Sequence, residues 1–216
     1  MTNLHPLSRR ILCCGLAFGA AYLVAASALA QSNIVQIEEH WELVIGEPDS
    51  SVSAPQAAMV MSPHSDLDGQ FFLFTINHRS VPSYEPGGLQ VQLWNGDEIV
   101  TSESWGSSVL DQSNDTVAWV ERLSVADGSL TFEVLDGSSN AWGGFGGEEL
   151  SISVPTELAS LNGYRPAISL GESQVGYAGN RVQRLLLKKL RWQTADGEWH
   201  ELHAPIDIDT DLDPDE

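Results

Sequence analysis

The chain has 216 residues, of which 30 are Asp or Glu and 10 are Lys or Arg, so its formal net charge at pH 7 is −20. A field of this sign repels nucleic acid and anionic lipid surfaces, and it argues against polyanionic ligands in general. Apolar residues make up 42% of the chain, which is enough to build one sizeable hydrophobic core.

The first thirty residues have the pattern of a signal peptide. Arg9-Arg10 precede a long apolar run, and Ala28-Leu29-Ala30 provides the small residues of a cleavage site. We predict cleavage near Ala30 and a secreted or periplasmic protein with no membrane span after cleavage. The arginine pair also resembles a weakened twin-arginine signal, and an uncleaved anchor is the alternative. Both cysteines lie in this segment, so the mature chain contains neither a disulfide nor a Cys-ligated metal.

From residue 31 to 204 the sequence is a succession of short strands separated by turns. Apolar and polar residues alternate in most of them, as in strands with one buried face. Asn95-Gly96, Asp127-Gly128 and Asp196-Gly197 each indicate a tight hairpin. The strands are expected at residues 34–45, 57–61, 70–76, 89–94, 98–105, 116–125, 130–135, 150–154, 166–170, about 182–194 and 199–202, and a single helical turn is expected within 155–162.

The long segment after residue 181 has two readings. Val182, Leu185, Leu186 and Leu190 fall at helical spacing. We favour a strand, because the segment runs directly into the Asp196-Gly197 hairpin and because the glycines before it leave no capped entry for a helix.

These elements predict an all-β, antiparallel two-sheet β-sandwich of jelly-roll type with little helix. The domain organisation is a signal peptide at 1–30, one sandwich domain at 31–204 and a disordered acidic tail at 205–216, where six of the last ten residues are acidic.

The segment Pro166-Ala167-Ile168-Ser169-Leu170-Gly171, followed by a glycine-bearing loop, Asn180 and a strand ending in Leu190-Arg191-Trp192, resembles the closing region of laminin-G-like and other concanavalin A-like lectin/glucanase domains. The resemblance implies a strand that ends in glycine and a long last strand that pairs near the first. It covers about a quarter of the mature chain. Because this superfamily includes lectins, adhesion modules, glycosidases and scaffolds, it implies a fold rather than an activity.

For binding, the best candidate is the polar face of strand 89–94. Gln90, Gln92 and Trp94 alternate with apolar residues, so their side chains point out together. Amides that hydrogen-bond hydroxyl groups, beside an indole that stacks on a sugar ring, suit a neutral polysaccharide. Asn77, Trp105 and Trp142 are expected to extend this surface. We therefore predict a non-enzymatic module that binds extracellular polysaccharide; the alternatives are an adhesion scaffold without a small ligand and a glycoside hydrolase.

Acidic residues offer two further candidate sites. Asp66 and Asp68, in a D-x-D-G turn beside His64, present oxygen ligands at alternate positions and are a candidate calcium site. No motif places two carboxylates at the spacing that retaining glucanases need, so no catalytic residue is assigned. Glu121 and Glu133 are a carboxylate pair that could lie side by side across their hairpin.

Overall fold

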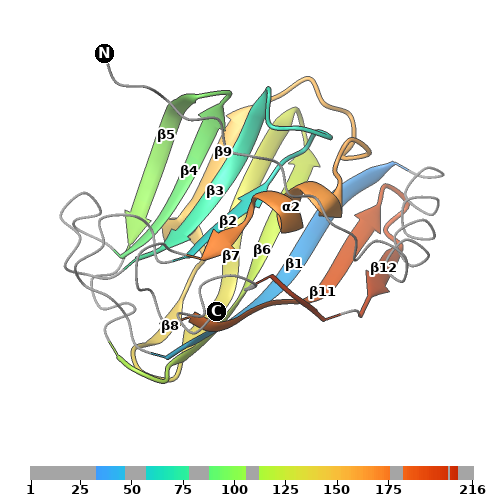
Figure 1. The fold of residues 1–216 in the computed structure, drawn as a ribbon. Coiled ribbons are helices and arrows are strands. Elements are labelled where there is room, and N and C mark those ends of the chain that lie inside the picture. The colour runs from blue at the N-terminus through green and yellow to red at the C-terminus, as the bar shows by residue number, and fades with distance from the viewer. Residues whose placement is uncertain are drawn as a thin grey trace, which may run out of the picture. The chain divides into compact units, whose positions relative to one another are not determined.

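The computed structural model describes residues 33–46, 57–77, 88–105, 112–175, 182–203 and 205–208, all of which belong to one unit, Ser32–Glu216. The signal peptide expected at 1–30 and the last residues of the acidic tail lie outside the described residues. Within this part of the chain, two antiparallel sheets pack against each other and helix is sparse (Figure 1). The prediction of an all-β sandwich is confirmed.

Sheet A, the larger sheet, contains eight of the described strands. Their order is β12-β11-β1-β6-β7-β8, with β9 beside β7 and β13 beside β11. The members are β1 (Ile34–Ile45), β6 (Thr116–Ala126), β7 (Ser129–Ser139), β8 (Gly143–Phe145), β9 (Ser151–Pro155), β11 (Val182–Thr194), β12 (Trp199–Leu202) and β13 (Ile206–Asp207).

Sheet B contains five of the described strands in the order β10-β2-β3-β4-β5. In the described ranges, two short helices accompany the sheets, the 3₁₀ helix η2 (Glu148–Leu150) and α2 (Pro166–Glu172). No helix in the described ranges is both long and apolar enough to cross a membrane. The strands are β2 (Ala57–Met61), β3 (Gln70–Ile76), β4 (Leu89–Asn95), β5 (Glu98–Trp105) and β10 (Gln174–Val175).

The core lies between the two sheets, where the alternating apolar residues of both meet. Phe72 of β3 stacks on Phe132 of β7 at 5.2 Å between ring centroids, and Phe74 contacts the edge of Trp119 at 5.8 Å. These contacts identify the inner face of each sheet, so the side chains that alternate with them point away from the other sheet. We call that side the outer face.

Three hairpins in the described part of the chain turn at dipeptides in which glycine follows Asn or Asp and which connect two paired strands. In the turn between β6 and β7, Asp127 and Gly128 both have positive φ, 49° and 73°. This left-handed pair is the geometry that matches the twist of the two strands, and Asp-Gly adopts it at low cost. The predicted hairpins at Asn95-Gly96 and Asp196-Gly197 are also confirmed, since β4 pairs with β5 and β11 with β12.

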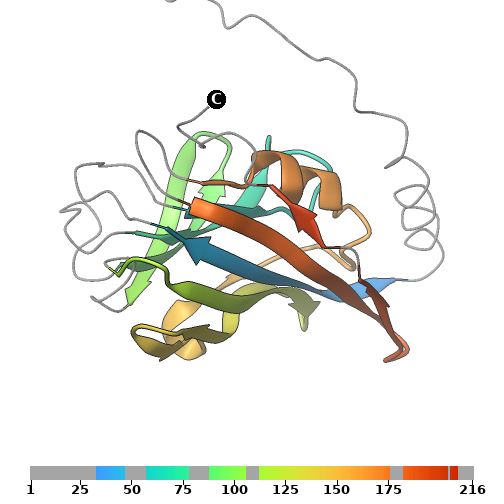
Figure 2. The ribbon, with the colours of Figure 1, turned by 60° about the horizontal axis from the view of Figure 1, so that its bottom comes forward.

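The long segment 182–194 is a strand, β11, which runs along β1 (Figure 2). Its register with β1 shifts at three points of β1: between Ile34 and Gln36, between His40 and Trp41, and between Val44 and Ile45. The second and third shifts each insert an extra residue into β11 and reverse which of its residues face the core. Because of these bulges, the buried Val182 and Leu185 are three residues apart, and so are Leu187 and Leu190. This spacing explains why the sequence also fits a helix.

One predicted strand is wrong. Residues 166–170 form the start of α2, and the helical turn expected within 155–162 is not where the helix lies. Pro166 occupies the first turn, where a missing N–H costs nothing, and the preceding Arg165 is extended. The helix contacts β2: the Ser169 hydroxyl donates to the carbonyl oxygen of Val60 at 2.8 Å.

The sheet continues beyond the predicted domain end at residue 204. Ile206 and Asp207 form β13, which pairs with Leu187 and Leu186 of β11. The prediction of a disordered tail from 205 is therefore wrong for these two residues. Disorder at 209–216 stays a prediction.

Gly137 of β7 gives a direct test of packing at the edge of the core. A Cβ at this position would lie 2.3–2.5 Å from ring atoms of Phe145, which itself packs against Phe74 and Trp142. We expect Gly137→Ala to lower the free energy of unfolding by about 1–3 kcal/mol, as overpacking does. Gly144→Ala is the matched control, because its Cβ would meet nothing nearer than 3.7 Å. Equal losses in urea unfolding of the two variants would contradict this reading.

Candidate functional site

The predicted binding residues Gln90, Gln92 and Trp94 do share the outer face of sheet B. They form a hydrogen-bonded row, in which Trp94 Nε1 donates to Gln92 Oε1 at 2.9 Å and Gln92 Nε2 donates to Gln90 Oε1 at 2.7 Å. Only 8% of Gln92 is exposed, and Trp94 stacks on Phe71 at 6.1 Å. Much of the row's hydrogen-bonding capacity is therefore used within the row.

The other three residues of the predicted surface have different positions. Asn77 is fully buried, and its amide nitrogen donates to Thr75 and to the carbonyl oxygen of Gly88. Trp105 pairs in register with the buried Leu89, which places it on the inner side of sheet B. Trp142 precedes β8 in the other sheet and contacts Phe145 at 4.9 Å. The structure therefore does not bring the six residues together.

Asp66 and Asp68 lie exposed in the turn between β2 and β3. Asp66 Oδ1 accepts a hydrogen bond from the backbone N–H of Asp68 at 3.2 Å, and the Ser62 hydroxyl donates to the carbonyl oxygen of Asp66 at 2.8 Å. These bonds define an Asx turn. Among the described residues, no group of three or more His, Cys, Asp or Glu side chains is arranged to hold a metal ion. Calcium binding at this turn stays a prediction.

Two carboxylates do meet inside the sandwich, but they are Glu39 and Glu121. They are direct partners across β1 and β6, and both are fully buried on the inner face. The expected pairing of Glu121 with Glu133 is wrong, because Glu121 lies opposite Val134, and Glu133 points to the other face, where it lies opposite Arg122.

Each carboxylate of this pair is held by the indole two residues away on its own strand. Trp41 Nε1 donates to Glu39 at 3.1 Å and Trp119 Nε1 donates to Glu121 at 2.8 Å. The Tyr164 hydroxyl also donates to Glu39, whereas Glu121 Oε2 has no hydrogen-bond partner. The two carboxylates are thus unequally satisfied.

Burial raises the pKa of Glu39, although the neighbouring Ser169 hydroxyl and the hydrogen bonds from Tyr164 and Trp41 oppose it. Burial, and then repulsion from Glu39, raise the pKa of Glu121 well above its ordinary value. Glu121 therefore keeps its proton to a higher pH than Glu39. Since neither side chain has any exposed surface, this pair belongs to the core and does not reach a substrate from outside.

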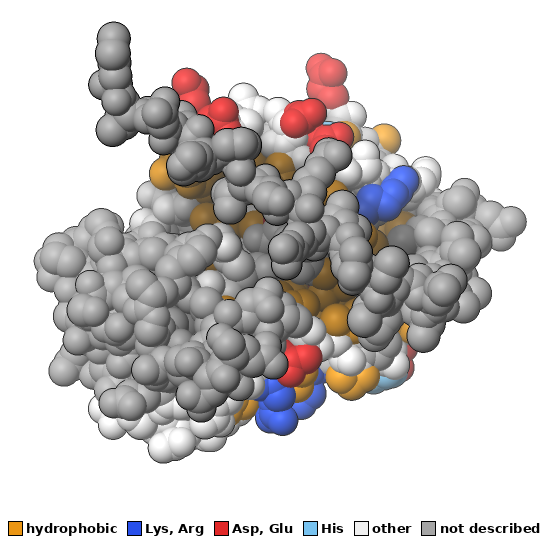
Figure 3. Space-filling model, in the orientation of Figure 1, with side chains coloured by type: hydrophobic (Ala, Val, Ile, Leu, Met, Phe, Trp, Pro, Cys, Tyr) orange, Lys and Arg blue, Asp and Glu red, His pale blue; other side chains and the backbone are white. Residues whose placement is uncertain are grey.

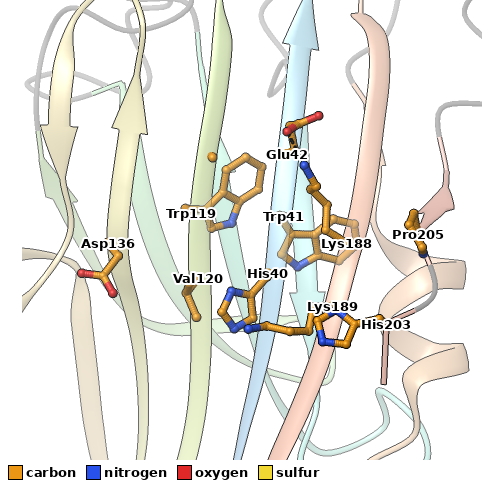
Figure 4. A pocket seen from close by; sticks show the side chains of 11 residues that line it. His40, Trp41, Glu42, Trp119, Val120, Asp136, Lys188, Lys189, His203 and Pro205 are labelled. Atoms are coloured by element: carbon orange, nitrogen blue, oxygen red, sulfur yellow. Dashed lines mark hydrogen bonds and ion pairs between the residues drawn. The ribbon is translucent and has the colours of Figure 1, made fainter. Parts of the chain in front are cut away.

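The outer face of sheet A carries an open groove with a volume of about 530 Å³ (Figure 4). It crosses β7, β6, β1 and β11, from Asp136 on β7 to His203 and Pro205 beyond β12. The buried Trp41 and Trp119 underlie its floor. Its residues are Asp136, Ala118, Trp119, Val120, His40, Trp41, Glu42, Lys188, Lys189, His203 and Pro205.

A row of charges in cross-strand register lies beside the groove. This charge ladder consists of Glu133, Arg122, Glu38, Arg191 and Glu201, one residue from each of five neighbouring strands. Arg122 Nε donates to Glu38 at 3.0 Å, Arg122 lies 3.7 Å from Glu133, and Arg191 donates to the second oxygen of Glu38. The ladder joins the strands that form the floor of the groove.

Glu38 is the centre of the ladder, with only 1% of its side chain exposed. Burial by itself would raise the pKa of Glu38, but the surrounding His40, Arg191 and Arg122 outweigh it and hold the pKa far below its usual range. The carboxylate is therefore ionised throughout the physiological pH range.

A second carboxylate of β1, Glu42, lines the groove and forms ion pairs with two basic residues of β11. Lys188 Nζ lies 2.7 Å and Arg184 3.1 Å from its two carboxylate oxygens. The described basic residues on the outer face of sheet A are Arg122, Arg184, Lys188, Lys189 and Arg191. Figure 3 shows the molecule in the orientation of Figure 1, and the described basic side chains seen there also occur in small groups. The sequence shows that basic residues are concentrated in the last long strand. That they lie near His40 and Arg122, on two other strands, follows only from the register of the strands in sheet A.

Comparisons with known proteins give no further assignment. The chain matches no protein-family model. It is similar to no curated protein sequence at a significant level.

Proposed function

We propose that this protein is an exported β-sandwich module that binds extracellular polysaccharide in the groove on the outer face of sheet A, without acting on it as an enzyme. The observation that carries the proposal is the groove itself, which is open along the sheet and lined by donors and acceptors from several strands. Pockets for small ligands have similar volumes but are largely enclosed. An open groove suits a chain that extends past both ends of the site.

The composition of the lining also supports a hydroxyl-rich ligand. The lining contains both polar and apolar side chains. The apolar ones, Ala118 and Val120, lie between the polar residues His40, Asp136, Lys189 and His203. Sugars carry hydroxyl groups at their edges and C–H groups on their faces, so they match such a mixed surface. The paired carboxylates of the sandwich are buried, which favours binding over hydrolysis.

The resemblance to concanavalin A-like domains is consistent with this proposal, but it is not its basis. The strand that the resemblance implied at 166–170 is α2. The long last strand that pairs with the first is present as β11 and β1. Membership of that superfamily stays a prediction.

Binding to a panel of immobilised neutral and acidic polysaccharides tests the proposal. We expect the purified chain to be retained by one class, and Ala118→Trp to reduce retention at least about tenfold by filling the groove, equivalent to about 1.4 kcal/mol. Ser124→Trp is the matched control, since Ser124 lies on the same strand and outer face but does not line the groove. Both variants are expected to keep a thermal midpoint within a few degrees of the wild type, as surface substitutions do.

Trp94→Ala decides between the two surfaces. If the groove is the site, this variant on sheet B binds like the wild type. Loss of binding in Trp94→Ala with normal binding in Ala118→Trp would place the ligand on the predicted Gln90–Trp94 row. No retention by any member of the panel would contradict polysaccharide binding and favour a structural or adhesion module.

A further inference from the structure

Both lysines of the chain, Lys188 and Lys189, are adjacent in β11 and both line the groove. In a regular strand, neighbouring side chains point to opposite faces, so one of the two would be buried. The register shift opposite His40 and Trp41 removes this alternation: Lys189 pairs with His40, Leu187 pairs with Trp41, and Lys188 is the extra residue. A backbone irregularity thus places two ammonium groups on one face.

The two lysines differ in what they contact. The Lys188 ammonium lies on Glu42, as described above. Lys189 makes no hydrogen bond or ion pair with any described residue, although it is close enough to Glu201 to contribute to lowering that carboxylate's pKa. On the outer face of sheet A, Arg122, Arg184 and Arg191 each have a carboxylate within 4 Å. Among the described basic residues of this face, Lys189 is the cation left without one.

Two histidines flank Lys189 in the groove. His40 is its cross-strand partner on β1, and His203 lies just beyond β12, on the other side of β11 (Figure 4). His40 Nε2 is buried, makes no hydrogen bond and lies 3.7 Å from Glu38. His203 Nε2 lies 3.0 Å from Glu201. Lys189 therefore lies between two imidazole rings at the side of the groove away from Asp136, and of the described basic groups there, its ammonium is the one without a carboxylate partner.

We infer that Lys189, flanked by His40 and His203, is a subsite for an anionic group on the sugar units of the bound polysaccharide, either a carboxylate or a sulfate ester. This inference rests on the proposed function, which it narrows to acidic polysaccharides. An ammonium without a carboxylate partner provides the charge-assisted hydrogen bonds that such a group needs. Lys188 is excluded from this role because its ammonium is already paired with Glu42.

The net charge of −20 works against an anionic ligand, and the sequence alone argued against polyanions on that ground. The local arrangement changes the balance, because charges more than about 8–10 Å away are largely screened at physiological salt. Among the acidic neighbours, Glu38 and Glu42 are paired with arginines and Lys188, and Glu201 lies 3.0 Å from His203. Among the described residues of the groove, the Lys189 ammonium therefore remains as the unpaired cation that an anionic group of the ligand can contact.

Affinity measurements with three soluble polymers test the inference: polygalacturonate with carboxylates, a sulfated galactan, and a neutral galactan. We expect the wild type to bind one of the acidic polymers and to bind the neutral one at least about tenfold more weakly, since the neutral polymer has no charged group to accept a hydrogen bond from the ammonium. Lys189→Gln should abolish this preference. Lys188→Gln, the matched control with the same charge change, should alter affinity less than about threefold because its ammonium is already paired.

The outcomes separate this inference from the proposed function. Equal affinity for neutral and acidic polymers, lost in Ala118→Trp but unchanged in Lys189→Gln, would overturn the anionic subsite and leave the groove as the binding site. Preference for polygalacturonate or for the sulfated polymer identifies the anionic group as carboxylate or sulfate. Binding to none of the three polymers, nor to any member of the wider panel, would overturn both.

Discussion

Replacing Glu38 with alanine is expected to lower the free energy of unfolding by about 3 kcal/mol, near the lower end of the range for removing one partner of a buried ion pair. The carboxylate bridges arginines from both neighbouring strands, so its loss leaves two guanidinium groups without their central acceptor. Since about a third of each arginine is exposed, water restores part of their solvation. Urea unfolding at pH 7 measures the difference.

Glu42→Ala is the matched control for Glu38→Ala. Glu42 is also on the outer face of β1 and also contacts two cations, but those cations are about half exposed. Exposed pairs contribute about 0–1 kcal/mol, so this variant should unfold almost like the wild type. Equal losses in the two variants would show that the charge ladder has no special role.

The contribution of Glu38 has a defined pH dependence. Its folded-state pKa lies below the ordinary value of 4.5, so its stabilisation is present above pH 4.5 and is lost as the pH falls through the folded-state pKa. The difference between wild type and Glu38→Ala should therefore shrink in acid. A difference that stays constant from pH 7 down to pH 3 would contradict this assignment.

Glu121→Gln is expected to stabilise the protein at pH 8 by about 1–3 kcal/mol, because a neutral amide replaces a carboxylate that is costly to ionise in the core. Glutamine reproduces the protonated form of Glu121: its oxygen still accepts from Trp119, and its amide group replaces the unpaired Oε2. It also removes the repulsion from Glu39. Unfolding in urea at pH 5 and pH 8 measures this effect.

The sign of the Glu121 effect is opposite to that of Glu38. Because the folded-state pKa of Glu121 is raised, its contribution to stability is fully present below 4.5 and is lost as the pH rises through the folded-state pKa. The advantage of Glu121→Gln should therefore be larger at pH 8 than at pH 5. Glu133→Gln, on the outer face of the same hairpin, controls for the loss of one charge. Destabilisation of Glu121→Gln at pH 8 would contradict a buried carboxylate with raised pKa.

The strands and hairpins were predictable because their signals are local. Alternation identified β1 and β6, and Asp127-Gly128 identified the turn between β6 and β7, since each signal needs only a few consecutive residues. The helix α2 was missed because Ala167–Leu170 fits either a strand or a helix. Pro166, which favours the first turn of a helix, was the signal that distinguished them.

The groove and the carboxylate pair were not predictable, because both depend on which strands become neighbours. Glu39 visibly interrupts the apolar face of its strand, but nothing in the sequence places it opposite Glu121. Likewise, strict alternation assigns Lys188 and Lys189 to opposite faces, and only the bulge brings both to the groove. For the Gln90–Trp94 row the shared face was predictable, whereas the hydrogen bonds that its members make with one another were not.

The pairing of β1 with β11 has a consequence for how the protein folds. These two strands lie side by side in sheet A, with Ile34 opposite Thr194, although almost the whole described chain separates them. Closing so long a loop delays folding, and domains dominated by such distant contacts fold in milliseconds to seconds. A nascent chain that has not yet reached Thr194 lacks the partner for one edge of β1. The sandwich can be completed only after the segment that ends at Thr194 has been synthesised.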